Sequence, residues 1–333
     1  MHPVQLDSNA TPIRIELPFR PDSVNVYLFR QPEPVLIDAG YNSTACWDAL
    51  VAGLAEQHLT PADLKHVVIT HPHIDHYGLA ARIARESDAK VWIAHGAMHV
   101  MRLTNPQWGH RLAYYHDVLL PGMGLPDDMI ERFAANVNRT ALHSEPVADE
   151  CLFGFGEGDV FHWGGVTWQT LHTPGHDSQQ MCFYQPETRQ LISGDMLLAK
   201  APTPVVDAPN AGEPRKPSLP AFMQSLDRLE AMDIDVVYPG HGELFWQHRQ
   251  VIQAQRERIL NRKEECYQHV KNGINTVAGL LKVMYAYLPL EHGMVGLWML
   301  LGYLDLLRAE ERVCETIVER AGGIGAVWHY TVC

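Results

Sequence analysis

The sequence lacks a hydrophobic run long enough to cross a membrane. Near the C-terminus, the longest strongly apolar stretch without Asp, Glu, Lys or Arg is residues 292–304, whereas a membrane-spanning helix needs about 20 residues. Residues 1–10 contain no basic segment followed by an apolar one, so no secretory signal is expected. These absences predict a cytoplasmic protein without a membrane partner.

Cysteine is scarce and follows no pattern. The 333 residues include six cysteines, and no two of them form a Cys-x-x-Cys pair. In a chain of this length, scattered cysteines favour reduced thiols in a cytoplasm over a disulfide framework. We therefore expect a hydrophobic core, and not a set of disulfides, to stabilise the fold.

Basic residues are in the minority. Lys and Arg total 26 against 39 Asp and Glu, which gives a formal net charge of −13. This excess of negative charge argues against a general affinity for the phosphate backbone of nucleic acids. Histidine, by contrast, is abundant, with 19 residues, and the placement of these histidines decides the functional prediction.

The first 240 residues alternate strand patterns with helical patterns. Short apolar and β-branched segments predict strands, and the segments between them predict helices. This alternation is typical of an α/β fold in which helices cover a sheet. The predicted strands are residues 24–29, 35–37, 67–70, 90–94, 160–163, 166–171, 181–184, 191–193 and 236–238. The predicted helices include residues 44–54 and 78–85, and residues 226–232 are predicted to be the end of another helix.

Two segments depart from this alternation. Residues 101–145 are helix-like and rich in aromatic side chains, which predicts a helical cap inserted into the N-terminal domain. Residues 248–333 predict three helices and a hairpin, the pattern of a winged-helix-like domain with its own small core. The predicted organisation is therefore an N-terminal domain at residues 1–247, with the insertion at about residues 101–145, and a C-terminal domain at residues 248–333.

A cluster of metal-ligand residues follows one predicted strand. His71, His73, Asp75 and His76 lie within six residues, directly after residues 67–70. Imidazole and carboxylate groups suit zinc, iron and manganese. Alternate residues of an extended loop point the same way, so His71 and His73 can share one metal while Asp75 and His76 face a second. A chance histidine-rich surface loop is the weaker interpretation.

Three further candidates each follow a predicted strand. His176 and His241 lie beside Pro-Gly turns, and Asp195 follows Gly194. Each alone is typical of an ordinary turn residue, but strand ends are where open α/β sheets build their sites. Together with the first cluster they make five histidines and two aspartates, a set of the right size for two metals that share a carboxylate and a hydroxide.

The content and order of these residues resemble the metallo-β-lactamase superfamily over roughly residues 14–246. The segment Ile-Asp-Ala-Gly at residues 37–40 is part of the match. The resemblance implies an αββα sandwich with metals at one edge. It also implies that Asp38 orients ligands without binding metal. The implied ligands are His71, His73 and His176 for the first metal, Asp75, His76 and His241 for the second, and Asp195 as the bridge.

Departures within the superfamily narrow the resemblance. The second ligand position is His73, where the flavodiiron branch carries Glu, and the complete set argues against the mononuclear persulfide dioxygenases. Glyoxalase II, the lactonases and the RNA-processing members carry the same residue types at the positions of Asp195 and His241, so the chain resembles these branches. The C-terminal segment resembles, in topology and spacing, a group that includes a mitochondrial lactamase-like endoribonuclease.

Two reactions compete. In the first, two divalent ions would supply hydroxide to an ester, thioester or lactone. Zinc is the expected metal, with iron or manganese as alternatives. Asp75 would hold the nucleophile and carry its proton. The alternative is a nuclease or phosphodiesterase. Residues 256–320 contain nine basic and nine acidic residues, and the predicted third helix is apolar. This balance predicts no nucleic-acid partner and favours packing or a homodimer contact through the C-terminal domain.

Aromatic residues of the insertion are candidates for a substrate pocket. If residues 101–145 cover the metals, these side chains line an apolar pocket for an acyl group. The alternative is that they only pack the insertion onto the rest of the protein. The candidates are Trp108, Tyr114, Tyr115 and His116.

Overall fold

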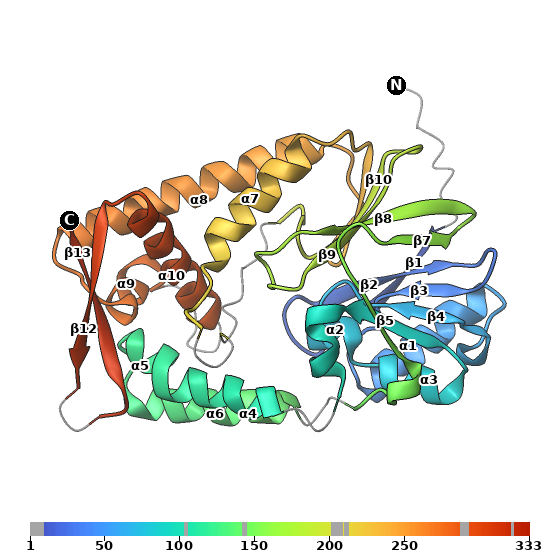
Figure 1. Cartoon of the computed structure of the whole chain (residues 1–333), viewed down its shortest axis with the longest axis horizontal. Coiled ribbons are helices and arrows are strands. Elements are labelled where there is room, and N and C mark those ends of the chain that lie inside the picture. The colour runs from blue at the N-terminus through green and yellow to red at the C-terminus, as the bar shows by residue number, and fades with distance from the viewer. Residues whose placement is uncertain are drawn as a thin grey trace.

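The computed structural model describes residues 10–102, 106–141, 145–200, 209, 213–286, 293–320 and 323–333. Two β-sheets lie at one end of the molecule, and a helical part extends from them to a C-terminal hairpin (Figure 1). Within the described ranges, no helix combines the length and the apolar character that crossing a bilayer requires.

The first sheet has six strands in chain order, β1-β2-β3-β4-β5-β6. The strands from β1 to β3 are antiparallel, and those from β3 to β6 run parallel. The parallel strands therefore end at one common edge, where their loops can build a site. The strands are β1 (Ala10–Glu16), β2 (Ser23–Phe29), β3 (Val35–Ile37), β4 (His66–Val68), β5 (Lys90–Ala94) and β6 (Leu152–Phe155).

The second sheet has five strands in the order β11-β10-β9-β8-β7. Only β10 and β11 are parallel in this sheet. Every predicted strand is present, with bounds that differ by at most two residues, whereas β1 and β6 were not predicted. The strands are β7 (Val160–Trp163), β8 (Val166–His172), β9 (Met181–Gln185), β10 (Gln190–Gly194) and β11 (Val236–Pro239).

Helices cover the outer face of the first sheet. In α1 (Thr44–Glu56), the buried side chains recur at helical spacing, and the Ser43 hydroxyl accepts a hydrogen bond from the backbone N–H of Cys46 at 3.2 Å. This helix packs against β1. The neighbouring elements are η1 (Pro61–Asp63), α2 (Ile74–Tyr77), α3 (Ala80–Glu86) and η2 (His95–Met101). One continuous hydrophobic cluster joins these helices to the space between the sheets.

A second hydrophobic cluster lies on the other side of the second sheet and continues to the C-terminus. Residues of α7 and the start of α8 pack in this cluster with residues of the second sheet. From there α8 runs along one side of the molecule to the C-terminal hairpin (Figure 1). The helices are α7 (Ser218–Glu230), α8 (His248–Lys271), α9 (Val277–Met284) and α10 (Gly293–Ala309).

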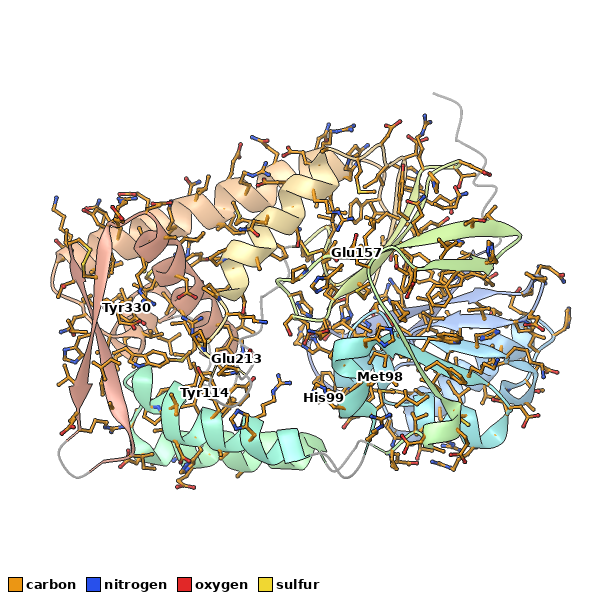
Figure 2. The ribbon with its side chains drawn as sticks, in the orientation of Figure 1. Met98, His99, Tyr114, Glu157, Glu213 and Tyr330 are labelled. Carbon is orange, nitrogen blue, oxygen red and sulfur yellow. A yellow bond between two sulfur atoms is a disulfide. The ribbon has the colours of Figure 1, made fainter. Side chains whose placement is uncertain are left out.

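The insertion packs on the C-terminal part of the chain. Tyr115, Leu119 and Leu120 are buried in the same cluster as Leu300 and Tyr330, and Tyr330 lies beside α10 (Figure 2). The apolar side of the insertion and the last 80 residues therefore share one core. The insertion consists of α4 (Pro106–Tyr114), the π-helical η3 (Tyr115–Leu119), α5 (Leu120–Gly122) and α6 (Asp127–Ala141), and η4 (Asp149–Cys151) follows it.

The C-terminal segment has the predicted order of three helices and a hairpin. The strands of the predicted hairpin are β12 (Val313–Glu319) and β13 (Ala326–Val332), whereas the winged-helix arrangement stays a prediction. The expectation of six reduced thiols is wrong for one pair, because Cys314 and Cys333 form a disulfide. The antiparallel hairpin brings these two distant positions to a Cα–Cα distance of 5.2 Å, within the range that a disulfide can bridge.

Candidate metal centre

Seven of the histidines and aspartates singled out in the sequence meet at one edge of the two sheets. Each of them follows the C-terminal end of a strand. Four come from the loop after β4, and the other three follow β8, β10 and β11. The seven are His71, His73, Asp75, His76, His176, Asp195 and His241.

The loop after β4 turns directly into a short helix. His73 is the N-cap residue of α2, which places Asp75 and His76 on its single turn. Gly78 ends this turn against the backbone of a neighbouring loop, since a Cβ at this position would lie 2.6 Å from the backbone nitrogen of Asn42. The absence of a side chain here lets α2 lie close to the sheet edge.

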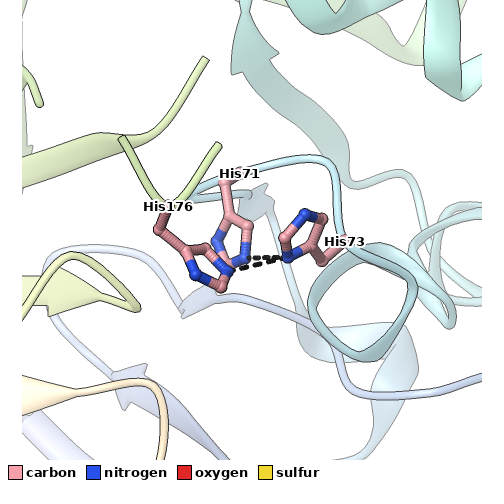
Figure 3. A group of neighbouring side chains, drawn as sticks. All are labelled: His71, His73 and His176. Atoms are coloured by element: carbon pink, nitrogen blue, oxygen red, sulfur yellow. Dashed lines mark hydrogen bonds between the residues drawn. The ribbon is translucent and has the colours of Figure 1, made fainter. Parts of the chain in front are cut away.

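His71, His73 and His176 form the first group of ligand atoms (Figure 3). His73 Nδ1 lies 3.0 Å from His71 Nε2 and 2.8 Å from His176 Nε2. One imidazole nitrogen carries at most one hydrogen, so it cannot donate to both neighbours. Ligand atoms about 2.0–2.1 Å from a tetrahedral zinc lie roughly 3.3 Å from each other. The three nitrogens therefore lie close enough together for one cation to contact all of them.

Asp75, His76 and His241 form a second group. His241 Nε2 lies 3.4 Å from His76 Nε2 and 3.4 Å from Asp75 Oδ2. The Asp75 Oδ2 to His76 Nε2 distance is 4.0 Å. These spacings also fit atoms that surround a single cation.

Asp195 lies between the two groups. Its Oδ2 is 3.5 Å from His176 Nε2 and 3.1 Å from His241 Nε2, and its Oδ1 is 3.5 Å from His76 Nε2. Asp195 Oδ1 is also buried without a hydrogen-bond partner among the described residues. A buried carboxylate oxygen without a donor is costly, and a cation at this position would remove that cost.

Asp38 orients one histidine of each group. Its Oδ1 accepts a hydrogen bond from the backbone N–H of Thr70 at 2.8 Å, and its Oδ2 faces the Thr70 hydroxyl at 3.0 Å and His76 Nδ1 at 2.8 Å. A carboxylate only accepts, so His76 Nδ1 and the Thr70 hydroxyl both donate to it. The Thr70 oxygen, 2.9 Å from His71 Nδ1, then accepts from that nitrogen. Both Nε2 atoms are thereby left with lone pairs toward the cluster.

The backbone at Asp38 adopts an unusual conformation to reach this position. Its φ of 61° lies in the left-handed region, which a non-glycine residue enters only at a cost. The hydrogen bond from the backbone N–H of Asp38 to the Val68 carbonyl, 2.9 Å long, holds it there. Backbone strain of this kind is typical of functional sites.

The rings of His73 and His241 also have partners on their far sides. His241 Nδ1 donates to the Ser23 carbonyl at 2.5 Å, so its Nε2 also carries a lone pair toward the cluster. His73 Nε2 lies 3.6 Å from the buried carboxylate of Asp177, and its Nδ1 faces the first group. Partners at the far nitrogen fix the ring orientation and tautomer of metal-binding histidines.

The histidines of the first group are set to be neutral. Burial lowers the pKa of His71 and His73 well below the ordinary imidazole value and lowers that of His176 as well. Other imidazoles nearby add to the effect, because two positive charges would repel. Neutral imidazole is the form that binds a metal.

The second group is electrostatically different. Burial opposes the charged form of His76, but the carboxylates of Asp195, Asp38 and Asp75 outweigh it and raise the His76 pKa well above its usual range. The pKa of His241 rises for the same reason, mainly through Asp195. Burial would raise the pKa of Asp195, but His241 and His76 hold it well below its usual range.

The four pocket candidates of the insertion lie in different surroundings. Tyr115 is buried against the rings of Phe133 and Trp298, and His116 bonds to Asp117 and Glu131 of the insertion itself. Tyr114 is half-buried and projects from α4 toward α10 (Figure 2). The side chain of Trp108 lies outside the described residues. A pocket formed by these four stays a prediction.

The sequence argument missed two residues near the cluster. Thr70 passes the effect of Asp38 on to His71, and its position directly before the first ligand is the signal that could have found it. Arg111, on α4, lies close enough for its charge to contribute to the lowered pKa of His73. Its Nε donates to the Tyr115 hydroxyl at 3.1 Å. The insertion therefore brings a cation toward the histidine cluster, which no local motif indicates.

Comparison with models of protein families shows which family the chain belongs to. The family model described as the metallo-beta-lactamase superfamily matches residues 19–241. The chain belongs to the metallo-β-lactamase superfamily. This confirms the family predicted from the sequence and, with it, the prediction of a hydrolase. All seven clustered side chains lie within the matched residues.

Named relatives extend over most of the chain. It is 27% identical over 307 residues to the probable metallo-hydrolase YqjP of Bacillus subtilis, covering 90% of this chain and 92% of the relative. It is also 25% identical over 271 residues to an atrochrysone carboxyl ACP thioesterase of Aspergillus fumigatus, covering 78% of this chain and 67% of the relative. A metallo-hydrolase and a thioesterase are thus both among the proteins that this chain resembles.

Solved structures share the fold. A metallo-beta-lactamase family protein from Thermus thermophilus superposes with a TM-score of 0.80 at 24% identity, over 98% of this chain and 99% of that one. A beta-lactamase domain protein from Burkholderia ambifaria gives 0.78, also at 24% identity, over 98% and 92%. These likenesses confirm the predicted αββα sandwich.

Proposed function

We propose that the chain is a hydrolase that uses two divalent metal ions to cleave a small ester, thioester or lactone. The position of Asp195 carries this proposal, because its two carboxylate oxygens each lie 3.5 Å from an Nε2 atom of a different group, that of His176 or of His76. A shared carboxylate is the arrangement by which two ions are held close enough to act on one substrate.

The donor set fits zinc, with iron or manganese as alternatives. When bound, two such ions lower the pKa of a shared water toward neutrality and polarise the carbonyl oxygen of the substrate. The ligands would be His71, His73 and His176 for the first ion, Asp75, His76 and His241 for the second, and Asp195 as the bridge.

We assign proton transfer to Asp75. Its side chain is 14% exposed, whereas that of His76 beside it is fully buried. Asp75 is therefore the most exposed residue of the second group, in which the His241 side chain is 8% exposed. Its carboxylate can accept the proton of the attacking water and deliver it to the leaving group. Asp38 has a different task, because its three hydrogen bonds keep His71 and His76 in the ligand tautomer.

An acyl substrate agrees with the surroundings of the cluster. The thioesterase relative acts on an acyl group carried by ACP, as its name states, and the aromatic insertion offers apolar surface, on which each buried methylene contributes about 0.8 kcal/mol to binding. The net charge of −13 disfavours polyanionic substrates by long-range repulsion. A small acyl compound is therefore the proposed substrate, and no nucleic acid is proposed as a partner.

A hydrolysis screen tests the reaction class. The metal-free protein would be reloaded with zinc or manganese and assayed on acyl thioesters, lactones, aryl esters and a phosphodiester. We expect cleavage of an acyl substrate, and Asp75→Asn should lower turnover by orders of magnitude. Metal content measured in the same samples separates a lost proton carrier from a lost ion. Phosphodiester cleavage far faster than any acyl cleavage would instead support a nuclease and overturn the proposal.

Metal stoichiometry tests the dinuclear centre independently of any substrate. Elemental analysis should give close to two divalent ions per chain. Asp195→Ala removes the bridge, so occupancy at both positions should fall. Full occupancy in this variant would contradict the assignment of Asp195.

A further inference from the structure

The loop that carries His241 is attached to the opposite sheet. This loop, residues 239–242 (the His241 loop), begins at the last residue of β11 in the second sheet, and the β2 strand of the first sheet faces it. The backbone N–H of Asn25 on β2 donates to the Gly240 carbonyl at 2.7 Å. The His241 ring in turn donates to the Ser23 carbonyl at 2.5 Å.

Two buried side chains of β2 complete the attachment. Asn25 Nδ2 lies 3.0 Å from the Pro239 carbonyl oxygen and 2.8 Å from that of Gly242, and it donates to both. The Tyr27 hydroxyl donates to the Pro239 carbonyl at 2.7 Å. Asn25 and Tyr27 are only 5% and 2% exposed, so water does not compete for these bonds. Three of the four carbonyls of the loop are thus held by one strand of the other sheet.

This attachment matters because the candidate metal centre is divided between the sheets. Asp75 and His76 follow β4 of the first sheet, whereas Asp195 and His241 follow strands of the second. Side-chain packing between two sheets sets their separation but leaves sliding motions soft, while directional hydrogen bonds resist them. A second tie, from the Met181 N–H to the Thr70 carbonyl at 2.9 Å, lies beside the first group of ligands.

We infer that Asn25 and Tyr27 are positioning residues for the second metal ion, acting through the His241 loop. This inference rests on the proposed dinuclear function. Both side chains hold loop carbonyls, and their loss lets His241 move relative to Asp75 and His76. The first ion would be held by other residues, and the hydrogen bond from Met181 to Thr70 supports that group. Loss of Asn25 or Tyr27 should therefore weaken the binding of the second ion and not that of the first. Substitutions behind a ligand typically weaken metal affinity by about 10- to 100-fold.

The test compares two variants that each lose one tyrosine hydroxyl. Tyr27→Phe removes the bond to the Pro239 carbonyl. The matched control, Tyr184→Phe, removes a hydroxyl that donates to the Asp233 carbonyl at 2.8 Å, at the other end of the second sheet. Zinc and cobalt(II) affinities of the full chain would be measured by chelator competition, with the melting temperature of the metal-free protein recorded in parallel. Asn25→Ala gives a second, stronger perturbation of the same contact.

We expect Tyr27→Phe to raise the dissociation constant of the second ion, the one that is lost in His241→Ala, about tenfold and to leave the first ion unchanged, while Tyr184→Phe changes neither. In a His241→Ala background, which lacks the second site, Tyr27→Phe should have no further effect on the remaining ion. Equal weakening of both ions, or weakening that persists in that background, would reduce Tyr27 to a general structural role and overturn the inference.

Wild-type affinity for both ions in Tyr27→Phe and Asn25→Ala would also overturn it. That result leaves the dinuclear proposal intact, because the wild-type protein would still bind two ions. Fewer than two ions on the wild-type protein is the separate result by which the proposed function itself fails, and the inference falls with it.

Discussion

Replacing Asp38 with asparagine tests how this protein sets the tautomers of its histidines. The change is nearly isosteric, and Asn can still accept the bond from the Thr70 backbone N–H at the Oδ1 position. Its amide nitrogen, however, replaces Oδ2, which faces His76 Nδ1 and the Thr70 hydroxyl at 2.8 and 3.0 Å. An amide nitrogen donates where the carboxylate accepted, so His76 Nδ1 becomes an acceptor and its hydrogen moves to Nε2. That hydrogen then points at the candidate metal position.

The hydrogen bond between Thr70 and His71, a histidine of the first group, can reverse its direction in the same way. If the Thr70 oxygen accepts from the new amide, its hydrogen is free to turn toward His71 Nδ1, 2.9 Å away. His71 Nε2 would then also carry a hydrogen and lose its lone pair. Each ion loses the support of a bond to a charged group, worth about 1.5–3 kcal/mol. At about 1.4 kcal/mol per tenfold, this predicts that each ion binds roughly 10- to 100-fold more weakly.

Chelator competition with zinc would measure both dissociation constants of Asp38→Asn. The matched control is Asp305→Asn, which neutralises another buried carboxylate, in this case one that bonds to Arg215 at 2.5 and 2.8 Å within the C-terminal core. The control should lower the unfolding free energy without changing metal affinity. Asp38→Asn that binds both ions with wild-type affinity would refute the tautomer argument, and an equal loss of affinity in both variants would show a general effect of destabilisation.

Two further predictions follow from charge and packing. Because the pKa of His76 is raised well above and that of His71 lowered well below the ordinary value, protons compete with metal mainly at the second group. As the pH falls, the second ion should therefore dissociate before the first. Metal analysis after dialysis at several values between about pH 5 and 8 checks this order of loss. Loss of both ions at the same pH would contradict the prediction. Tyr115→Ala should lower the free energy of unfolding by about 3 kcal/mol in urea titrations, since Tyr115 is only 5% exposed. The exposed neighbour Val118, changed to Ala, should have almost no effect, and a Tyr115→Ala variant as stable as wild type would show that the ring is not part of the core.

The sequence predicts this fold where local patterns carry the information. Short segments rich in apolar residues, such as residues 35–37 and 91–94, lie in parallel strands whose bounds were predicted correctly. The strand β1 was missed because Pro12 and exposed polar residues interrupt its pattern, and pairing along its whole length with β2 overrides that weak local signal. The strand β6 was missed because it has four residues and a central glycine, Gly154.

In the candidate metal centre, ligands that lie close together in the sequence could be predicted, whereas contacts between distant residues could not. The spacing of His71, His73, Asp75 and His76 is visible in the sequence because one loop supplies all four. The tie from Asn25 to Gly242 joins residues 217 positions apart, and neither residue type suggests a function by itself. Only the topology, which brings β2 beside the end of β11, reveals this contact.

The shared core of the insertion and the C-terminal helices has a consequence for synthesis on the ribosome. By the time His241 emerges, every candidate ligand is available, so the metal centre can assemble on a nascent chain. The apolar side of the insertion, around Leu120, must wait for Tyr330 and the rest of its partners. At about 5–20 residues per second, that interval is roughly 5–20 s. We expect the nascent protein to expose this apolar surface of the insertion during that time, and transiently exposed apolar surface makes a chain prone to aggregation.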